Sequence, residues 1–198
     1  MTNGKRNPDF YAAQMAEYVR RLDASCAFTG HRPSKLPWKL ALSAPEYVTF
    51  YDLLEKQIEF LTKFGISHYY CGIAIVTDLI CAEIGLALRE KNPAIKLHCA
   101  IPCKSQADKW AASLREQYHA ILDKTDSITF VSREHTKNCM PVRNRFMVDH
   151  SSIVLAVYNG ECRGGTAATV RYARKMGREL IILNPSTLNV VHEREILP

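Results

Sequence analysis

Short motifs that identify common cofactor and metal sites are absent from this sequence. It contains neither GxxxxGK[ST] nor GxGxxG, which excludes two widespread glycine-rich phosphate loops. It also contains no HExxH sequence and no CxxC pair, so we predict no metal site and no bound cofactor. A ligand site in this chain must therefore be built from other residues.

Long hydrophobic segments are absent as well. No apolar run approaches the ~18 residues of a membrane-spanning helix, and the first ten residues, MTNGKRNPDF, lack the apolar stretch of a secretory signal peptide. The seven cysteines are an odd number without paired spacing, which favours free thiols in a reducing compartment over a disulfide framework. We therefore expect a cytoplasmic protein that makes no membrane contact.

Positive charge is in modest excess. Lysine and arginine number 26 against 20 acidic residues, a net charge of +6, and this favours anionic partners such as nucleotides or nucleic acid. The basic residues are scattered, however, and the densest run, residues 171–178, is typical of a solvated helix face. Nucleic acid is therefore the less favoured of the two partners.

Short apolar segments alternate with helical patterns from residue 25 onward. Most of these segments are apolar on both faces, which is typical of buried strands in a parallel sheet. The alternation predicts an α/β fold, a Rossmann-like doubly wound, mostly parallel sheet with helices on both faces. The expected strands are residues 25–30, 68–74, 96–102, 127–132, 153–158 and 179–184.

Helix signals between the strands complete this pattern. Ser105 and Asp108 read as a capping box that opens a helix through residue 122. Near the N-terminus, Met15, Tyr18 and Leu22 predict an amphipathic helix laid on the domain. We accordingly divide the chain into a helical extension (1–24), a Rossmann-like domain (25–186) and a C-terminal tail (187–198).

The segment TGHRP places polar side chains directly after the first expected strand. Ligands of doubly wound sheets bind beyond the carboxyl ends of the strands, where the strand order reverses. Thr29, Gly30, His31 and Arg32 are therefore candidate binding residues. Gly30 permits close backbone approach, and Arg32 offers a planar fork for phosphate. The alternative is that Arg32 pairs with a surface carboxylate and His31 caps a loop.

The segment GIAIVTD repeats this arrangement after the second expected strand. Gly72 and Asp78 are candidate ligand residues there, although Asp78 equally suits a helix cap. Glu83 follows in an otherwise apolar helix. Because a buried carboxylate needs a partner, Glu83 either pairs with an arginine or faces the edge of the pocket.

A third candidate element follows the fifth expected strand. Gly164, Gly165 and Thr166 begin a helix, and the free backbone N–H groups at such a start form an anion site with the helix dipole. The alternative is an ordinary glycine-rich helix start. Three polar or glycine-rich strand ends together favour a shared ligand site.

Longer motifs, taken in order, resemble a known family. They are TGHRP, GIAIVTDLICAE, QADKWAASLREQYHAIL, CMPVRNRFMVDHSSIVLAVYNG and RGGTAATVRYA. Over roughly residues 25–185 the chain resembles the YpsA/YoqJ-like branch of the SLOG superfamily, to which DprA and the LOG phosphoribohydrolases belong. The resemblance implies a Rossmann-like sheet with a nucleotide-type pocket, and it leaves catalysis open.

Single positions carry the resemblance further. MPVRNRFM, residues 140–147, is similar to the LOG segment M-x-x-R-K-x-x-M, which makes Arg143 and Asn144 candidate site residues. The glycine-rich helix start is similar to the LOG element P-G-G-x-G-T. LOG enzymes place glutamates two and three residues after that threonine, where this chain has Ala168 and Thr169. The resemblance therefore does not extend to the catalytic carboxylate.

A second departure concerns the loop after the second expected strand. Val76 stands where related sequences usually have glycine. A β-branched side chain disfavours positive φ and close backbone approach. The pocket is therefore expected to be tighter or differently shaped on that side.

Three functions are consistent with these features. The favoured one is a cytoplasmic binder of a nucleotide or nucleotide-derived small molecule, a sensor or regulator in which Arg32 and Arg143 hold phosphate. The alternatives are hydrolysis of a nucleotide N-glycosidic bond, using Asp78, Glu83 or Asp149, and DprA-like binding of single-stranded DNA. Enzymatic activity and homo-oligomer formation are left open. The expected binding residues are Thr29, Gly30, His31, Arg32, Gly72, Asp78, Glu83, Arg143, Asn144, Gly164, Gly165 and Thr166.

Overall fold

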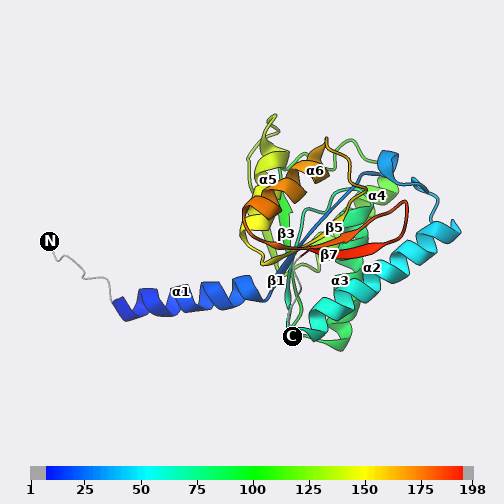
Figure 1. Ribbon diagram of the computed structural model, residues 1–198. Helices are drawn as coiled ribbons and strands as arrows, with labels where there is room; N and C mark the ends of the chain where they lie inside the picture. Colours follow the sequence, from blue (N-terminus) through cyan, green and yellow to red (C-terminus); the bar gives the residue numbers. More distant parts are fainter. Residues whose placement is uncertain (1–7, 194–198) are drawn as a thin grey trace.

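One seven-stranded sheet organises the protein in this computed structural model, which describes residues 8–193, with side chains from residue 14 onward (Figure 1). The strand order is β4-β3-β2-β1-β5-β6-β7, and only β7 runs antiparallel to its neighbour within the described residues. The order reverses between β1 and β5, which are paired side by side. The strands are β1 (Ser25–Gly30), β2 (His68–Cys71), β3 (Lys96–Ile101), β4 (Ser127–Phe130), β5 (Ile153–Val157), β6 (Glu179–Leu183) and β7 (Val190–Glu193).

Helices cover both faces of this sheet. Alternate residues of β1 belong to different cores: Cys26 and Phe28 pack with α2, α3 and α4, whereas Ala27 packs with α5 and α6. The Rossmann-like α/β prediction is therefore confirmed. The helices are α1 (Pro8–Asp23), α2 (Pro45–Lys63), α3 (Thr77–Lys91), α4 (Ala112–Leu122), α5 (Cys139–Asp149) and α6 (Gly165–Lys175), with a 3₁₀ turn η1 (Pro33–Lys35).

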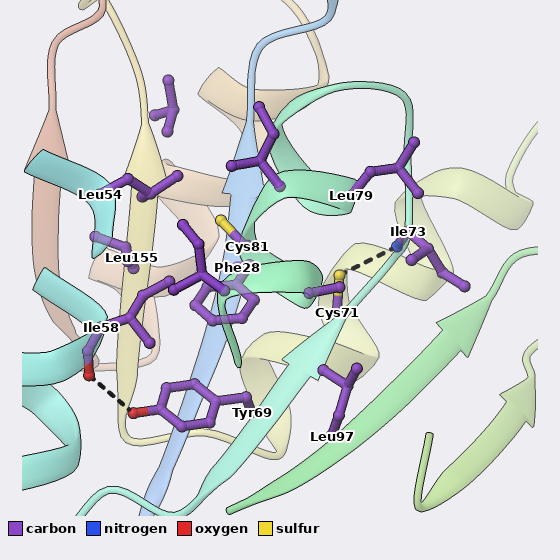
Figure 2. Close-up of a cluster of buried hydrophobic side chains, with 14 of the residues drawn as sticks. Phe28, Leu54, Ile58, Tyr69, Cys71, Ile73, Leu79, Cys81, Leu97 and Leu155 are labelled. Carbon is purple, nitrogen blue, oxygen red and sulfur yellow. Dashed lines mark hydrogen bonds between the residues drawn. The ribbon is translucent and has the colours of Figure 1, made fainter. Parts of the chain in front are cut away.

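The larger core lies under α2 and α3. Phe28 of β1 stacks on Tyr69 of β2 with ring centroids 5.4 Å apart, and both side chains are fully buried (Figure 2). The Tyr69 hydroxyl donates a hydrogen bond to the Ile58 carbonyl at 3.2 Å, so its polar end is satisfied inside the core. Burying an aromatic or large aliphatic side chain stabilises the fold by roughly 1.5–3 kcal/mol. This packing fixes the strands whose ends form the site.

The expected strands after the first one end one to three residues too late, and the two largest boundary errors concern β2 and α4. Strand β2 stops at Cys71, and the chain then turns through residues 72–76 before α3 begins at Thr77. Helix α4 begins at Ala112 rather than at Ser105. The Ser105 hydroxyl contacts the Cys103 sulfur at 3.5 Å instead of capping a helix. Residues 104–110 form turns, which bring Gln106 and Trp110 toward the end of the sheet.

The two ends of the chain also differ from expectation. Helix α1 projects away from the sheet (Figure 1), and its side chains Met15, Tyr18 and Val19 are exposed, so the prediction that it lies on the domain was wrong. The expected tail contributes β7, a strand of four residues whose signal in the sequence was weak. None of the described helices is long and apolar enough to cross a membrane. The division of the chain at residues 25 and 186 stays a prediction.

Candidate functional site

A cavity of about 210 Å³ lies at the carboxyl ends of β1 and β5, where the strand order reverses; we call it the switch-point cavity. Four separate segments form its walls: the loop after β1, the loop after β2, α5, and the start of α6. Parallel strands bring their carboxyl ends to one edge of a sheet, which is why these segments meet. The lining residues are Thr29, Gly30, His31, Arg32, Ser34, Lys35, Ala74, Ile75, Asp78, Met140, Arg143, Asn144, Met147, Arg163, Gly164, Gly165 and Thr166.

A buried ion pair forms one wall of the cavity. Arg143 Nη1 of α5 lies 3.4 Å from Asp78 Oδ2 of α3, and both side chains are only 6% exposed. The Ala74 N–H also donates to Asp78 Oδ2 at 3.2 Å. Burial raises the pKa of Asp78, and the Arg143 charge and these backbone hydrogen bonds oppose that rise. Asp78 therefore anchors an arginine and a loop, and its side chain does not cap α3.

Arg143 is only partly satisfied by this pair. Its Nε is buried and has no hydrogen-bond partner among the described residues. Arg32, by contrast, is exposed at the cavity mouth and forms no ion pair within residues 14–193. The two guanidinium groups thus line one cavity in different states. Arg143 is fixed, and Arg32 is available to an incoming anion.

Glycine at position 72 makes room for the Arg143 side chain. A Cβ atom at Gly72 would lie 1.1 Å from Arg143 Nη1 and 2.9 Å from Asp78 Oδ2. Gly72 does not line the cavity directly; it supports the ion pair from behind. At the end of β1, Gly30 has a similar role, because a Cβ there would lie 2.2 Å from Thr77 Cγ2 at the start of α3. Both glycines make room for protein side chains, whereas the expected close approach of Gly30 to a ligand stays a prediction.

The loop between Gly72 and α3 is strained at Val76. This residue has φ 72° and ψ −88°, a conformation that a β-branched residue rarely adopts. Its side chain is nevertheless buried, at 6% exposure, in the larger core. The chain therefore adopts positive φ here without the glycine that would make it easy, and packing holds the strained residue in place.

This strain predicts an inverted order of two variants. Val76→Gly should be more stable than Val76→Ala by about 1 kcal/mol, because glycine adopts positive φ at little cost and this gain exceeds the loss of the one buried methyl group by which the two variants differ. At most positions glycine is the less stable of the two. Urea denaturation of both purified variants measures the difference. An alanine variant as stable as the glycine variant would contradict the strain.

His31 joins the loops after β1 and β5. Its Nε2 lies 2.7 Å from Asn159 Oδ1, and the Asn159 N–H approaches the same nitrogen at 3.1 Å. Burial lowers the pKa of His31, so the imidazole is neutral at pH 7. Beside it, Lys35 and Glu161 form an ion pair at the surface. These contacts fit a role for His31 in positioning loops.

The start of α6 faces the cavity with its backbone. Gly164, at φ 107°, precedes the first helical residue, Gly165, and no side chain caps the helix there. The Thr166 hydroxyl donates to the Gly30 carbonyl at 2.9 Å, which ties α6 to the end of β1. The N–H groups of this first turn are therefore held at the cavity, as an anion site requires.

Thr169, at one of the two positions where LOG enzymes have glutamate, has a structural role in this chain. Thr169 is buried; its hydroxyl accepts a hydrogen bond from Asn144 Nδ2 at 2.8 Å and donates to the Gly165 carbonyl at 2.9 Å. The bond from Asn144 joins α5 to α6 beside the cavity, and the bond to Gly165 lies within α6. Among the described residues that line the cavity, Asp78 is the single carboxylate.

One expected site residue lies elsewhere. Glu83 points outward from α3 and accepts a hydrogen bond from Gln117 Nε2 of α4 at 2.7 Å. It lines a surface groove between α3 and α4 and not the switch-point cavity. The apolar helix pattern around Glu83 suggested burial, but the residue occupies the one exposed stripe of that helix. A role for Glu83 in the pocket is therefore wrong.

Sequence reasoning missed the residues of an adjoining pocket of about 90 Å³, which shares Arg32 and Arg143 with the cavity. Gln106 Nε2 donates to the carbonyls of Gly72 and Ile73, which fixes the orientation of its amide. Its Oε1 is buried without a hydrogen-bond partner among the described residues. Trp110 forms another wall. A polar glutamine four residues before a tryptophan was the available signal, but the expected helix placed both outside the site.

Comparisons with known proteins agree with this architecture. A family model, YpsA, described as the YspA SLOG family, matches residues 26–185. The chain is 31% identical over 141 residues to the uncharacterized SPbeta prophage-derived protein YoqJ of Bacillus subtilis, covering 64% of this chain and 82% of YoqJ. It is 28% identical over 158 residues to a UPF0398 protein of Bacillus licheniformis, covering 75% of this chain and 82% of that protein.

Two solved structures share the fold. DNA processing protein A (DprA) from Streptococcus pneumoniae superposes with a TM-score of 0.54 at 16% identity over 86% of this chain, which spans about half of that protein (53%). DprA from Helicobacter pylori, whose structure concerns its single-stranded DNA binding mode, gives a TM-score of 0.54 at 17% identity over 85% of this chain and 68% of its own length. At these identities the likeness concerns the fold alone.

Proposed function

The chain belongs to the YpsA family of SLOG proteins, and we propose that it binds a nucleotide or nucleotide-derived ligand in the switch-point cavity. The observation that carries this proposal is the convergence of three anion-binding groups on one cavity: Arg32, Arg143 and the backbone N–H groups that begin α6. Each of them suits a phosphate oxygen, and together they suit a phosphate group. We further propose a cytoplasmic sensor or regulator.

The rest of a nucleotide has a place beside this phosphate site. The adjoining pocket offers the indole ring of Trp110 and the unpartnered acceptor Gln106 Oε1. An aromatic wall suits a base ring, and a buried acceptor suits an N–H on the edge of a base. A nucleotide with its phosphate against α6 and its base edge toward Gln106 would use both pockets.

Binding without hydrolysis is favoured over N-glycosidic cleavage. Cleavage passes through an oxocarbenium-like state that a free carboxylate near the sugar stabilises. Asp78 is already paired with Arg143, and Thr169 bonds to Asn144 and Gly165. Native mass spectrometry of freshly purified protein tests for a co-purifying nucleotide, and incubation with nucleoside monophosphates and NAD tests for released base. Release of free base from these nucleotides by the protein would overturn the proposal that it binds its ligand without cleaving it.

Arg32→Ala should weaken the binding of AMP by about ten- to 150-fold. A hydrogen bond to a charged group contributes roughly 1.5–3 kcal/mol, and ~1.4 kcal/mol is a tenfold change in affinity. Arg32 forms no ion pair with the residues that the structure describes, so the variant should keep the stability of the parent protein. Calorimetry with AMP and with inorganic phosphate measures the loss.

Arg32→Lys serves as the matched comparison, because it keeps the charge and removes the planar fork. It should recover only part of the affinity. If the alanine variant binds AMP and phosphate as tightly as the parent protein, Arg32 does not hold the phosphate and the proposed site is misplaced.

A further inference from the structure

A second, larger groove continues the switch-point cavity along α5 and α6. It has a volume of about 520 Å³ and shares Met140, Asn144 and Gly165 with the cavity, so the two spaces adjoin at the start of α6. We call it the α5–α6 groove. Its lining residues are Met140, Pro141, Asn144, Arg145, Gly165, Ala168, Thr169, Arg171, Tyr172 and Lys175.

Positive charge distinguishes this groove from an ordinary gap between helices. Arg145 comes from α5, and Arg171 and Lys175 lie one turn apart on α6. All three side chains are exposed, and none of them forms an ion pair within residues 14–193. No carboxylate lines the groove among the residues that the structure describes. Its positive charge is therefore uncompensated.

Two carboxylates outside the groove contact side chains of α6. Asp149 at the end of α5 accepts a hydrogen bond from the Tyr172 hydroxyl at 2.8 Å. Glu193 of β7 forms an ion pair with Arg174 of α6, with 2.6 Å between Oε1 and Nη2. Neither side chain lines the groove. Arg174 neutralises Glu193, whereas Asp149 keeps its charge outside the groove; with three basic side chains and no carboxylate in its lining, the groove keeps an excess of positive charge, and an anion is the ligand that suits it.

The floor and one wall of the groove are fixed before any ligand arrives. The Asn144–Thr169 hydrogen bond holds α5 against α6 beneath it, and the Thr169 hydroxyl donates in turn to the Gly165 carbonyl within α6. The Arg145 guanidinium lies over the Tyr172 ring, 5.5 Å from its centroid, and the Tyr172–Asp149 bond holds that ring in turn. Gly165 and Ala168 keep the bottom open, since nothing lies within 4 Å of a Cβ at Gly165. A guanidinium held over a ring in this way offers positive charge to an anion.

We propose that the α5–α6 groove is a second anion subsite, so that the ligand of this protein carries at least two linked nucleotides. The first phosphate occupies the switch-point cavity, and the phosphodiester-linked unit follows the shared wall at Gly165 into the groove. Arg145, Arg171 and Lys175 hold the second phosphate there. The inference rests on the proposed function and names the class of its ligand.

The affinity and salt dependence of two probes test this subsite: 5′-AMP and the dinucleotide pApA, measured by calorimetry on the full chain. The parent protein should bind pApA at least tenfold more tightly than AMP. Its log–log salt slope for pApA should be steeper by about 0.7 for the added phosphate contact. The double variant Arg145→Gln/Lys175→Gln should bind pApA about tenfold more weakly than the parent protein does. Its affinity for AMP should be unchanged.

A second double variant, Lys63→Gln/Lys91→Gln, is the matched control. It removes the same charge at the carboxyl ends of α2 and α3, away from the cavity, and should bind both probes like the parent protein. Equal affinity and equal slope for AMP and pApA, or equal losses in the two double variants, would overturn the subsite while AMP binding in the cavity stands. Failure of the parent protein to bind either probe would overturn both proposals.

Discussion

Replacing Arg143 with alanine should lower the free energy of unfolding by about 3–5 kcal/mol, because it leaves the Asp78 carboxylate buried without its counter-charge. Asp78 is buried, and among the described residues Arg143 and the backbone N–H groups of Gly72 and Ala74 stabilise its charge. Urea denaturation at pH 8 measures the loss. Adding Asp78→Asn to Arg143→Ala should restore at least about 1 kcal/mol of the free energy of unfolding, because the neutral amide does not bury an unpaired charge. A double variant less stable than the single variant would contradict this explanation.

The same variant should also become sensitive to pH. Burial raises the pKa of Asp78 above its unfolded value, and loss of Arg143 raises it further. A carboxyl whose pKa is higher in the folded state binds more protons in the folded state than in the unfolded state at any pH between the two pKa values. The free energy of unfolding therefore falls as the pH rises through that range. The deficit of Arg143→Ala should therefore be smaller at pH 5 than at pH 8, by up to ~1.4 kcal/mol per pH unit within the window. An equal loss of unfolding free energy at pH 5 and pH 8 would mean that Asp78 is not the buried charge left unpaired in Arg143→Ala.

Gly72→Ala should lower the free energy of unfolding by almost as much, although it replaces neither charged residue. The new methyl group would occupy the position of the Arg143 guanidinium, 1.1 Å from Nη1, so the arginine must leave its pair with Asp78. We expect a loss of about 2–4 kcal/mol in unfolding free energy, most of it the penalty of an unpaired buried carboxylate. Thermal and urea denaturation check the value.

Gly85→Ala is the matched control for this prediction. Gly85 lies inside α3, and nothing lies within 4 Å of a Cβ placed on it. Alanine there should stabilise the protein by roughly 0.5–1 kcal/mol, because glycine is the poorer helix residue. The prediction fails if the two glycine-to-alanine changes have similar effects.

The sequence predicts best those parts of the site that follow directly after a strand. Thr29 and Gly165 lie far apart in the chain, yet both line the cavity, because strands of a parallel sheet end at a common edge. What the sequence could not supply was the rotation of helices about their axes. That rotation turns Glu83 toward Gln117 and buries Arg143 against Asp78. Neither outcome follows from spacing along the chain alone.

Two further misses have local causes. The capping box at Ser105 and Asp108 satisfies the sequence pattern of a helix start, but the hydroxyl of Ser105 contacts Cys103 and the chain turns instead. The apolar stripe of α1 satisfies the pattern of a packed helix, and nothing in the pattern states which surface should cover Tyr18. Both patterns describe local preference, and tertiary contacts decide whether the preference is used.

The Asp78–Arg143 pair also bears on how the protein comes apart. Asp78 belongs to α3 on one face of the sheet, and Arg143 belongs to α5 on the other, so the contact links the two helical layers across the end of the sheet. A partial opening that detached either layer would leave one of the two charges buried alone. Such half-open forms therefore carry a penalty beyond their lost packing, and this makes the two layers one cooperative unit.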